Sequence, residues 1–352
     1  MLEPDGRQTV QGVAARRVIV PLDVPALMPA RAARDAKMVS LSGETMGTTW
    51  SVKCVLSRQM SVESLRAGIQ VPLDSVIAQM STWIESSDIS CFNHASANSW
   101  HKLPQDFGFV LAYALSLAEE TGGAYDPASG ALVGLWGFGP ASRPRSVPAL
   151  DEISGARSCC GWRHIKRDKT RGVFQPGGVE LDLSSIAKGF AVDKVSASLH
   201  ARGLHDHLVE IGGELSGQGI KPDGGPWWVA LESFPSKADG AKGAHDAVVA
   251  LHGLAVATSG DHVRFFEQGG ERFSHTIDPR SGYPVTHALT SVTVIHSSCM
   301  KADALATALF VLGPEAGFDF AAHHSVAARF VSRVDDGYAE RMTPQLVAMF
   351  DE

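Results

Sequence analysis

Apolar and polar residues alternate in some stretches of the chain and recur every three to four positions in others. Alternation is typical of a strand with one buried face, and the longer repeat is typical of a helix packed on a core. The first pattern predicts a strand over 49–55. The second predicts a helix over 62–80, interrupted near Pro72, and another over 106–121 that ends before a Gly-Gly pair.

The second half of the chain mixes shorter elements. An alternating stretch at 178–183 predicts a strand that leads into a helix over about 185–204, and a largely apolar helix is expected over 301–312 before a Gly-Pro stop. Further short strands are expected near 208–211, 227–231, 247–252, 255–258 and 290–295. Because strands and helices do not alternate strictly, this order favours an α+β fold with mixed or antiparallel sheets flanked by helices.

Length and composition limit the domain organisation. At about 150 residues per domain, the 352 residues suggest one large or two medium domains. Residues 1–40 are rich in Pro, Ala and Arg without a sustained period, and they are expected to form a flexible N-terminal arm. The folded domain is expected over 41–340, with a C-terminal tail over 341–352.

Charge and hydropathy exclude several classes of protein. The chain has 31 Lys+Arg against 38 Asp+Glu, a net charge of -7, and no basic block, which argues against nucleic acid as a partner. No apolar run reaches the ~18–20 residues of a membrane span. Arg16 and Arg17 precede only three apolar residues before Pro21, so no signal sequence is evident and a cytoplasmic location is expected. The 5 cysteines form no C-x-x-C pair and are expected to be reduced thiols.

Familiar catalytic motifs are missing from the sequence. It has no G-x-x-x-x-G-K-[ST], no complete G-x-G-x-x-G, no H-E-x-x-H and no G-x-S-x-G, which argues against a P-loop NTPase, a Rossmann dehydrogenase and an HExxH protease. One internal echo is present, because D-P-x-S-G occurs at both 126–130 and 278–282. The two copies are either ordinary turns or paired loops that face one cleft.

The expected helix over 301–312 carries two polar side chains on an otherwise apolar surface. Asp303 and Thr307 are four residues apart and therefore lie one above the other on a single helix face. Asp303 could complement the helix dipole while Thr307 bonds back to a carbonyl. Alternatively, the two supply oxygen ligands to a hard cation such as Mg²⁺, which keeps waters and recruits phosphates for its other positions.

Two more segments permit phosphate and acid–base chemistry. Over 182–191, an Asp at a strand end runs into a helix whose first turn contains small residues and Lys188, which either binds a phosphate or is a capped helix start. Over 274–284, His, Asp, Arg and Ser crowd a loop after a strand. His275 there is either a general base near neutral pH or a structural hydrogen-bond donor.

Taken together and in order, these segments resemble the ApbE family, the FAD:protein FMN transferases. The resemblance covers roughly residues 42–315. The matching segments are 44–52, 80–83, 90–93, 122–127, 135–139, 182–193, 211–215, 257–261, 275–284 and 302–307. Any one of them is weak evidence, but the colinear set is specific.

The resemblance implies an ApbE-like fold of two lobes with a central FAD cleft between them. FAD is then a substrate: its FMN half is transferred to a Thr or Ser hydroxyl of a target flavoprotein, and AMP is released. A divalent ion, usually Mg²⁺, assists at the diphosphate. Family targets tend to present a short Ser/Thr-Gly-Ala-Ser/Thr stretch.

The resemblance also implies roles for individual residues. Ser185 (through its backbone carbonyl), Asp303 and Thr307 are the expected metal ligands, and His275 is the expected base, with Asp278 orienting it. The expected FAD contacts are Met46, Trp83, Ala124, Tyr125, Asp126, Asp182, Lys188 and Ile277.

The chain also departs from the family pattern. Some members have an acidic metal ligand three residues before the helix Asp, where this chain has Met300. Many members are exported, so the periplasm is the alternative to a cytoplasmic location. Two other functions stay open: Mg²⁺-dependent FAD hydrolysis to FMN and AMP, and FAD binding or assembly without catalysis.

Overall fold

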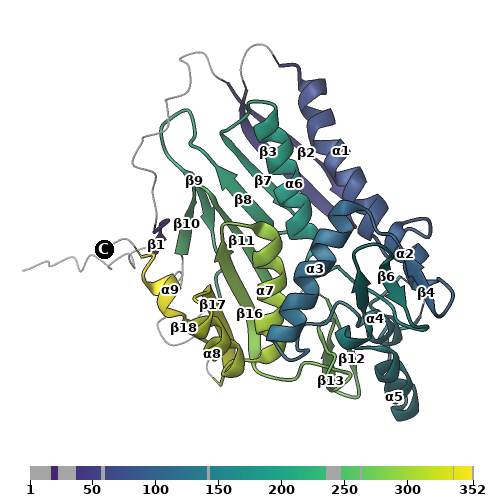
Figure 1. Ribbon diagram of the computed structural model, residues 1–352. Coiled ribbons are helices and arrows are strands. Elements are labelled where there is room, and N and C mark those ends of the chain that lie inside the picture. Colours follow the sequence, from purple (N-terminus) through teal and green to yellow (C-terminus); the bar gives the residue numbers. More distant parts are fainter. Residues whose placement is uncertain are drawn as a thin grey trace, which may run out of the picture.

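An eight-stranded antiparallel sheet forms the centre of the computed structural model, which describes residues 17–22, 37–56, 60–140, 143–234, 247–261, 264–335 and 337–350. The sheet has the strand order β18-β17-β16-β11-β8-β7-β3-β2 (Figure 1). Its strands are β2 (Lys37–Thr45), β3 (Thr48–Leu56), β7 (His207–Ile211), β8 (Glu214–Gln218), β11 (Leu254–Gly260), β16 (Leu289–His296), β17 (Ala327–Val334) and β18 (Gly337–Met342). Four of the seven joined pairs are neighbours in sequence, and the other three, β3 to β7, β8 to β11 and β11 to β16, are crossings.

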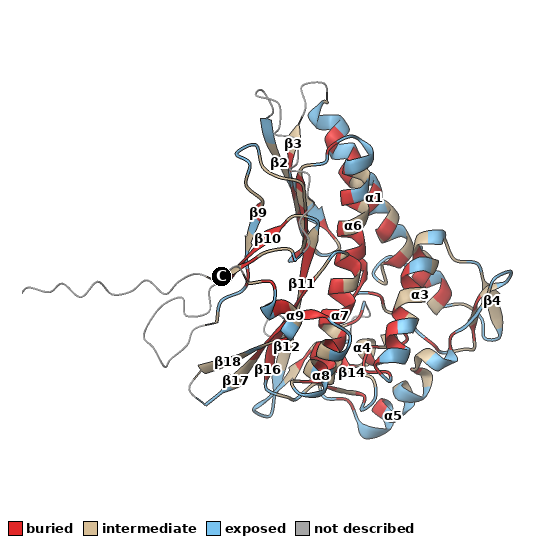
Figure 2. Cartoon of the chain, turned by 60° about the vertical axis from the view of Figure 1, so that its left-hand side comes forward, coloured by how far each residue is buried: buried red, intermediate tan, exposed pale blue. Residues whose placement is uncertain are grey.

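Helices cover one face of this sheet. Figure 2 shows the sheet and the helices as two layers, with buried positions where the layers meet. Two helices, α6 (Ala187–Ala201) and α7 (Cys299–Leu312), lie directly on the strands, and α1 (Val62–Met80), α3 (Gln105–Glu120) and α8 (Ala316–His323) flank them. Burial on both sides explains why α7 is apolar nearly all round.

A small sheet packs on the other side of the central strands. It has the order β1-β10-β9, built from β1 (Arg17–Ile19), β10 (Ala247–Leu251) and β9 (Trp227–Ala230). Ile19, in β1, is fully buried and bridges Phe350, just after α9 (Pro344–Val347). Parts of the expected arm over 1–40 and tail over 341–352 are thus held against the core, while 1–16, 23–36 and 351–352 lie outside the described residues.

Short elements form the remaining side of the molecule. They are α2 (Asp88–Asn93), β4 (Ser99–His101), α4 (Gly130–Leu135), α5 (Leu150–Cys159), the 3-10 helix η1 (Trp162–His164), β5 (Lys166–Asp168), β6 (Gly172–Gln175), β12 (Phe265–Gln268), β13 (Glu271–Ser274), β14 (Ile277–Asp278) and β15 (Tyr283–Pro284). Trp136 is fully buried here and its indole Nε1 donates to the Gly282 carbonyl at 2.9 Å. This bond anchors the loop that follows His275 to α4.

The structure corrects two expectations about local elements. The first helix is not interrupted at Pro72, because the carbonyl of Gly68, which Pro72 cannot bond, instead accepts a hydrogen bond from the Ser198 hydroxyl at 2.8 Å. Residues 178–183 are not a strand of any sheet. Their backbone groups pair with loops and with Asn93, whose side chain bonds both backbone groups of Leu181.

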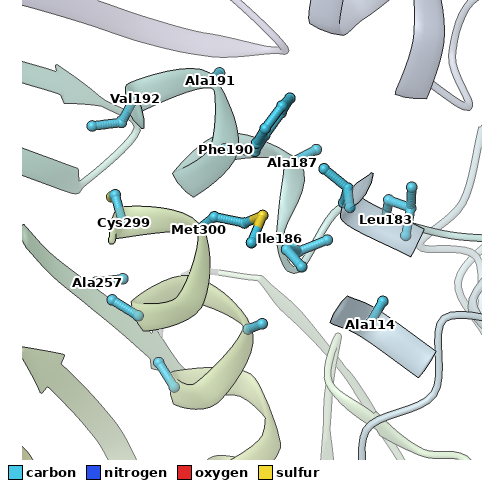
Figure 3. Packing of buried hydrophobic residues seen from close by; sticks show 14 of the residues in the cluster. Ala114, Leu183, Ile186, Ala187, Phe190, Ala191, Val192, Ala257, Cys299 and Met300 are labelled. Carbon is cyan, nitrogen blue, oxygen red and sulfur yellow. The ribbon is translucent and has the colours of Figure 1, made fainter. Parts of the chain in front are cut away.

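The contact between α6 and α7 sets the position of Asp303. A Cβ on Gly189 would lie 2.3 Å from the Cys299 carbonyl oxygen, so only glycine allows this approach. Figure 3 shows Ile186 beside Met300 at this contact. The carboxylate of Asp193, on α6, also accepts hydrogen bonds from the first turn of α7, at the backbone nitrogens of Cys299 and Met300 and at the Ser298 hydroxyl, and so caps that helix.

The predicted α+β class is therefore confirmed. Helices pack on sheets whose strand pairs are antiparallel, apart from the parallel β1–β10 pair. Within the described part of the chain, no helix has the length and apolar character needed to cross a bilayer.

Candidate active site

Asp303 and Thr307 lie on the face of α7 where the helix meets α6 and β11. Asp303 is 4% exposed, and its Oδ2 accepts a hydrogen bond from the backbone nitrogen of Gly189 at 2.9 Å. The Thr307 hydroxyl is 2.9 Å from the hydroxyl of Ser259 on β11. The pair predicted from spacing thus faces partners on two other elements.

Lys188 joins this pair from the first turn of α6. Its ammonium group donates to a carboxylate oxygen of Glu214, at the start of β8. Burial alone would lower the pKa of Lys188, but the charges of Asp303 and Glu214 hold it above its ordinary value. Two buried carboxylates therefore share one ammonium group.

The pKa values of Glu214 and Asp303 reflect the same shortage of positive charge around them. Burial and the neighbouring Asp303 raise the pKa of Glu214 to about 8, against the opposing effect of Lys188. Burial also raises the pKa of Asp303, opposed by Lys188 and by the Gly189 N–H. The second oxygen of Glu214, Oε2, is buried without a hydrogen-bond partner.

Ser185 and Tyr125 extend the cluster toward the loop after α3. The Ser185 hydroxyl donates to the Tyr125 phenol oxygen at 3.1 Å. Tyr125 is 3% exposed, and burial raises its pKa, opposed by the Ser185 bond and assisted by the negative charge of Asp303. Ala124, beside it in the chain, is also buried. The fold thus brings Ser185, Tyr125, Lys188, Asp303 and Thr307 to one place.

His275 lies just after β13 and is held by a backbone carbonyl. Its Nδ1 is 3.0 Å from the carbonyl oxygen of Arg264, and its backbone nitrogen donates to the same oxygen. Burial lowers the pKa of His275 to about 4, and the positive charges of Arg264 and Lys188 act in the same direction. The imidazole is therefore neutral near pH 7, and with Nδ1–H donating to the carbonyl, Nε2 is left as a proton acceptor.

Asp278 forms no hydrogen bond to His275 among the described residues, so its expected orienting role stays a prediction. Its Oδ1 accepts hydrogen bonds from the backbone nitrogen and Nε of Arg280, and its Oδ2 pairs with the same guanidinium at 2.9 Å. The short turn from Asp278 to Arg280 closes on itself, so a carboxylate there bonds its own loop first. The neighbouring Ile277 is buried against Trp136 in a separate apolar cluster.

Asp126 and Asp182, which are both expected to contact FAD, accept hydrogen bonds from backbone N–H groups. Asp126 accepts from the backbone nitrogens of Ala128 at 2.8 Å and Trp162 at 3.0 Å, and burial raises its pKa to about 6. Asp182 accepts from the backbone nitrogen of Ser184 at 2.7 Å. Both carboxylates therefore shape the loops that lead into the cluster.

Met46 and Trp83 lie at the ends of other elements. Met46 has a φ of 50° and forms, with Gly47 at φ 71°, the two-residue turn between β2 and β3. Trp83 follows α1 and is 63% exposed. Among the described residues, no hydrogen bond or ring contact links either of them to Asp303, and their role at FAD stays a prediction.

Sequence reasoning missed three residues that the structure places at the site. Glu214 pairs with Lys188, Ser259 meets Thr307, and Arg264 holds His275 through its carbonyl. Glu214 lay in the Gly-Gly-Glu segment at 211–215 and Ser259 in the segment at 257–261, so the signal was a matched segment without an assigned role. Arg264 gave no signal, because a backbone carbonyl leaves no trace in the residue type.

The donor atoms available to a metal are all oxygens. Within the described residues, no group of three His, Cys, Asp or Glu side chains is close enough to hold an ion. Asp303 supplies one carboxylate, and Thr307 and Ser185 add hydroxyl or carbonyl oxygens. Such a partial, hard-donor shell suits an ion that keeps waters and binds substrate phosphates, as Mg²⁺ does.

Comparison with known proteins identifies the class of protein. The family model described as "ApbE family" matches residues 46–330. A curated relative from Haemophilus influenzae, named FAD:protein FMN transferase, is 37% identical over 90% of this chain and 92% of its own length. One from Vibrio cholerae with the same name is 36% identical over 89% of this chain and 93% of its own.

Solved structures agree with these sequence matches. The apo form of the Pseudomonas stutzeri flavinyl transferase ApbE superposes with a TM-score of 0.83 at 39% identity, covering 90% of this chain and 97% of that chain. The Vibrio cholerae flavin transferase ApbE gives 0.82 at 35% identity, covering 89% and 99%. This chain belongs to the ApbE family. It is an enzyme of the transferase class, as the sequence predicted.

Proposed function

We propose that the protein is an FAD:protein FMN transferase, which moves the FMN part of FAD onto a Thr or Ser hydroxyl of a target flavoprotein and releases AMP. Two curated relatives with this name are 37% and 36% identical to this chain. The observation that carries the proposal in this chain is the neutral His275, with Nδ1 tied to the Arg264 carbonyl. A base in that state can take the proton of an acceptor hydroxyl.

The proposed reaction is a displacement at phosphorus, with one bond formed and one broken. The acceptor oxygen forms a bond to the phosphorus that carries riboflavin, while the bond from that phosphorus to the bridging oxygen breaks. The hydroxyl proton passes to Nε2 of His275, and AMP leaves with the bridging oxygen. We assign Lys188 to the diphosphate, and the influence of its charge on the pKa values of both His275 and Asp303 supports this assignment.

Asp303, Thr307 and Ser185 are the residues we assign to a Mg²⁺ ion. The fit rests on their oxygen donors and on the charge of the cluster, where Asp303 and Glu214 share only Lys188. When bound, the ion would neutralise diphosphate charge and ease departure of AMP. The chain's own part is to fix Asp303 through the Gly189 N–H and Thr307 through Ser259.

In this proposal the carboxylates of Asp278, Asp126 and Asp182 position the loops around the site. Asp278 holds Arg280 and with it the turn after His275. Asp126 holds the backbone just after Tyr125, and Asp182 holds the backbone just before Ser185. Met46, Trp83, Ala124, Tyr125 and Ile277 are assigned to contacts with the FAD rings, with the exposed indole of Trp83 offering a stacking face.

The test is to incubate the enzyme with FAD and Mg²⁺, with and without a flavoprotein that carries a Thr-Gly-Ala-Thr stretch. Transfer predicts AMP release that depends on the acceptor, together with covalent flavin on the protein. AMP release at the same rate without acceptor would instead identify an FAD pyrophosphatase. FAD binding without AMP under any metal condition would identify a binding protein.

A further inference from the structure

A cavity lies behind the helix that carries Asp303 and Thr307. It has a volume of about 310 Å³ and is formed where α3, α7 and α8 meet the end of β16 and the start of β17 (Figure 1). From α7, it is lined by Lys301 and Leu305. Asp303 follows Lys301 by two residues, as Thr307 follows Leu305, and each step of two turns about 200° round the helix. The cavity and the reaction site are therefore on opposite faces of α7.

The walls of the cavity are mostly apolar. Four buried side chains reach it from β16, α7 and the start of β17, namely Ile295, Leu305, Val326 and Ala327. Phe320 of α8 adds an aromatic ring, on which the exposed His324 stacks at 4.1 Å between ring centroids. Walls of this kind, around a volume at the lower end of small-molecule sites, suit a small ligand with an apolar body.

Three hydrogen-bond donors converge on this cavity. Lys301 Nζ lies over the Tyr113 ring, 5.7 Å from its centroid, and both side chains belong to the lining. His296 lines the cavity as well, and its Nδ1 accepts the backbone N–H of Ser298 at 2.9 Å. Burial lowers the pKa of His296, and the positive charge of Lys301 acts in the same direction. The neutral imidazole therefore carries its proton on Nε2, which is left as a donor close to Lys301.

No acceptor in the described part of the chain occupies these donors. There, neither the Lys301 ammonium group nor the Tyr113 hydroxyl forms an ion pair or a hydrogen bond, and the His296 ring uses only Nδ1. Burial and the negative charge of Glu120 raise the pKa of Tyr113, so its phenol keeps its proton. Glu120 is exposed at the lining and accepts a hydrogen bond from the Ser116 hydroxyl at 3.0 Å. One ammonium group and two neutral donors favour an anion of single charge.

We propose that this cavity binds a small organic monocarboxylate with an apolar body, at a site separate from the reaction site. The carboxylate meets Lys301, Tyr113 and His296, and the body packs on Leu305 and the other apolar walls. Inorganic phosphate fits less well, because it brings a second negative charge and the described lining has no second ammonium or guanidinium group. The inference does not rest on the proposed function, since none of the residues assigned to FAD, the metal or the base lines this cavity.

Phenylacetate is the probe for the test, and phenylacetamide, which has the same body without the charge, is the control ligand. An NMR titration of the full chain is expected to give a Kd of about 1 mM or tighter for phenylacetate, and about tenfold weaker binding of phenylacetamide. Lys301→Gln is expected to remove this preference. Tyr113→Phe keeps the ring but loses the hydroxyl, and is expected to weaken phenylacetate binding about fivefold. Lys53→Gln, at an exposed lysine on β3 outside the lining, makes the same change in net charge and should bind like the wild type.

Each other outcome overturns the inference. No measurable binding of phenylacetate, or equal affinity for the two ligands, removes the carboxylate site. A preference that survives in both Lys301→Gln and Tyr113→Phe places the probe elsewhere, and an equal loss in Lys53→Gln assigns the effect to net charge. Competition by FAD places the probe at the reaction site, whereas binding unchanged by saturating FAD is the expected result. A thermal melt checks each fold, and if Lys301→Gln is unfolded, Tyr113→Phe decides.

Discussion

Asp303 Oδ2 accepts a hydrogen bond from the backbone nitrogen of Gly189 at 2.9 Å, which ties the assigned metal ligand on α7 to the first turn of α6. The residue before Gly189 is Lys188, so one bond sets the spacing between the Asp303 carboxylate and the ammonium group. Gly189 itself is fixed by packing on Cys299. The site is thus a property of the contact between two helices, and changes at that contact should act on catalysis.

Replacing Asp303 by Asn should remove the response to Mg²⁺ and leave the fold intact. The amide keeps an oxygen for the Gly189 N–H but has no charge for the cation, and loss of metal assistance is expected to lower kcat by about 100-fold or more. AMP release against Mg²⁺ concentration measures the effect, and a thermal melt checks the fold. Asp106→Asn, which breaks only a partly exposed pair with Lys194, is the control. An unchanged Mg²⁺ response in Asp303→Asn would remove this residue from the site.

Gly189→Ala should weaken both stability and turnover. The added Cβ would meet the Cys299 carbonyl oxygen at 2.3 Å and Cβ of Asp303 at 2.7 Å, so α6 and α7 must separate. Overpacking of this kind costs about 1–3 kcal/mol of unfolding free energy. Gly108→Ala in α3 has open space around the new methyl group and should be neutral or slightly stabilising. Equal stability of the two variants in urea denaturation would contradict the close helix contact.

Lys188→Met should destabilise the protein in a pH-dependent way. Without the ammonium group, Glu214 and Asp303 remain buried together, and removing one partner of a buried ion pair costs about 3–5 kcal/mol. The pKa of Glu214 is already raised to about 8 in the folded protein, above the ordinary 4.5. Between these values the folded state binds a proton that the unfolded state lacks, so stability falls as pH rises, and it should fall more steeply in the variant.

A second substitution tests the cause of that loss. Glu214→Gln added to Lys188→Met removes one carboxylate and should recover most of the stability at pH 8. Chemical denaturation at pH 5 and pH 8 of the wild type and the two variants gives the comparison. A double variant as unstable as Lys188→Met would show that packing of the lysine stem, not charge, carries the effect.

The pH dependence of transfer should follow the neutral imidazole. Because burial lowers the pKa of His275 to about 4, the base form persists at neutral and mildly acidic pH, and activity should decline only as pH falls toward that value. His275→Gln should lower kcat by about 100-fold or more and abolish this limb of the profile. Asp278→Asn should keep the limb, since its carboxylate pairs with Arg280. A profile that is unchanged in His275→Gln would exclude this base.

Local patterns predicted the secondary structure well where one element carries its own signal. The apolar helix before Gly313, the three helices expected before it and four of the eight strands of the central sheet lie close to the expected positions. Extended residues at 178–183 also alternate, but alternation does not say which backbone will pair with them, and here loops and the Asn93 amide take that part. Continuity of α1 through Pro72 depends on Ser198, which is over a hundred positions away and cannot be read locally.

The site was predictable as a set of residues but not as a network. Spacing alone put Asp303 and Thr307 on one face, local chemistry made Lys188 and His275 candidates, and the resemblance gave all four their expected roles. Their partners come from other elements: Gly189 from α6, Ser259 from β11 and Glu214 from β8. Asp278 lies three residues from His275 and two from Arg280, and the turn, which the sequence does not show, brings its carboxylate to Arg280.

The decisive experiment for FMN transfer is mass spectrometry of an acceptor flavoprotein after incubation with this enzyme, FAD and Mg²⁺. We predict one phosphoester-linked FMN on a Ser or Thr of the acceptor and one AMP released per acceptor modified, with both products formed about 100-fold or more slowly when Asp303→Asn replaces the wild type. Free FMN and AMP beside an unmodified acceptor would contradict it.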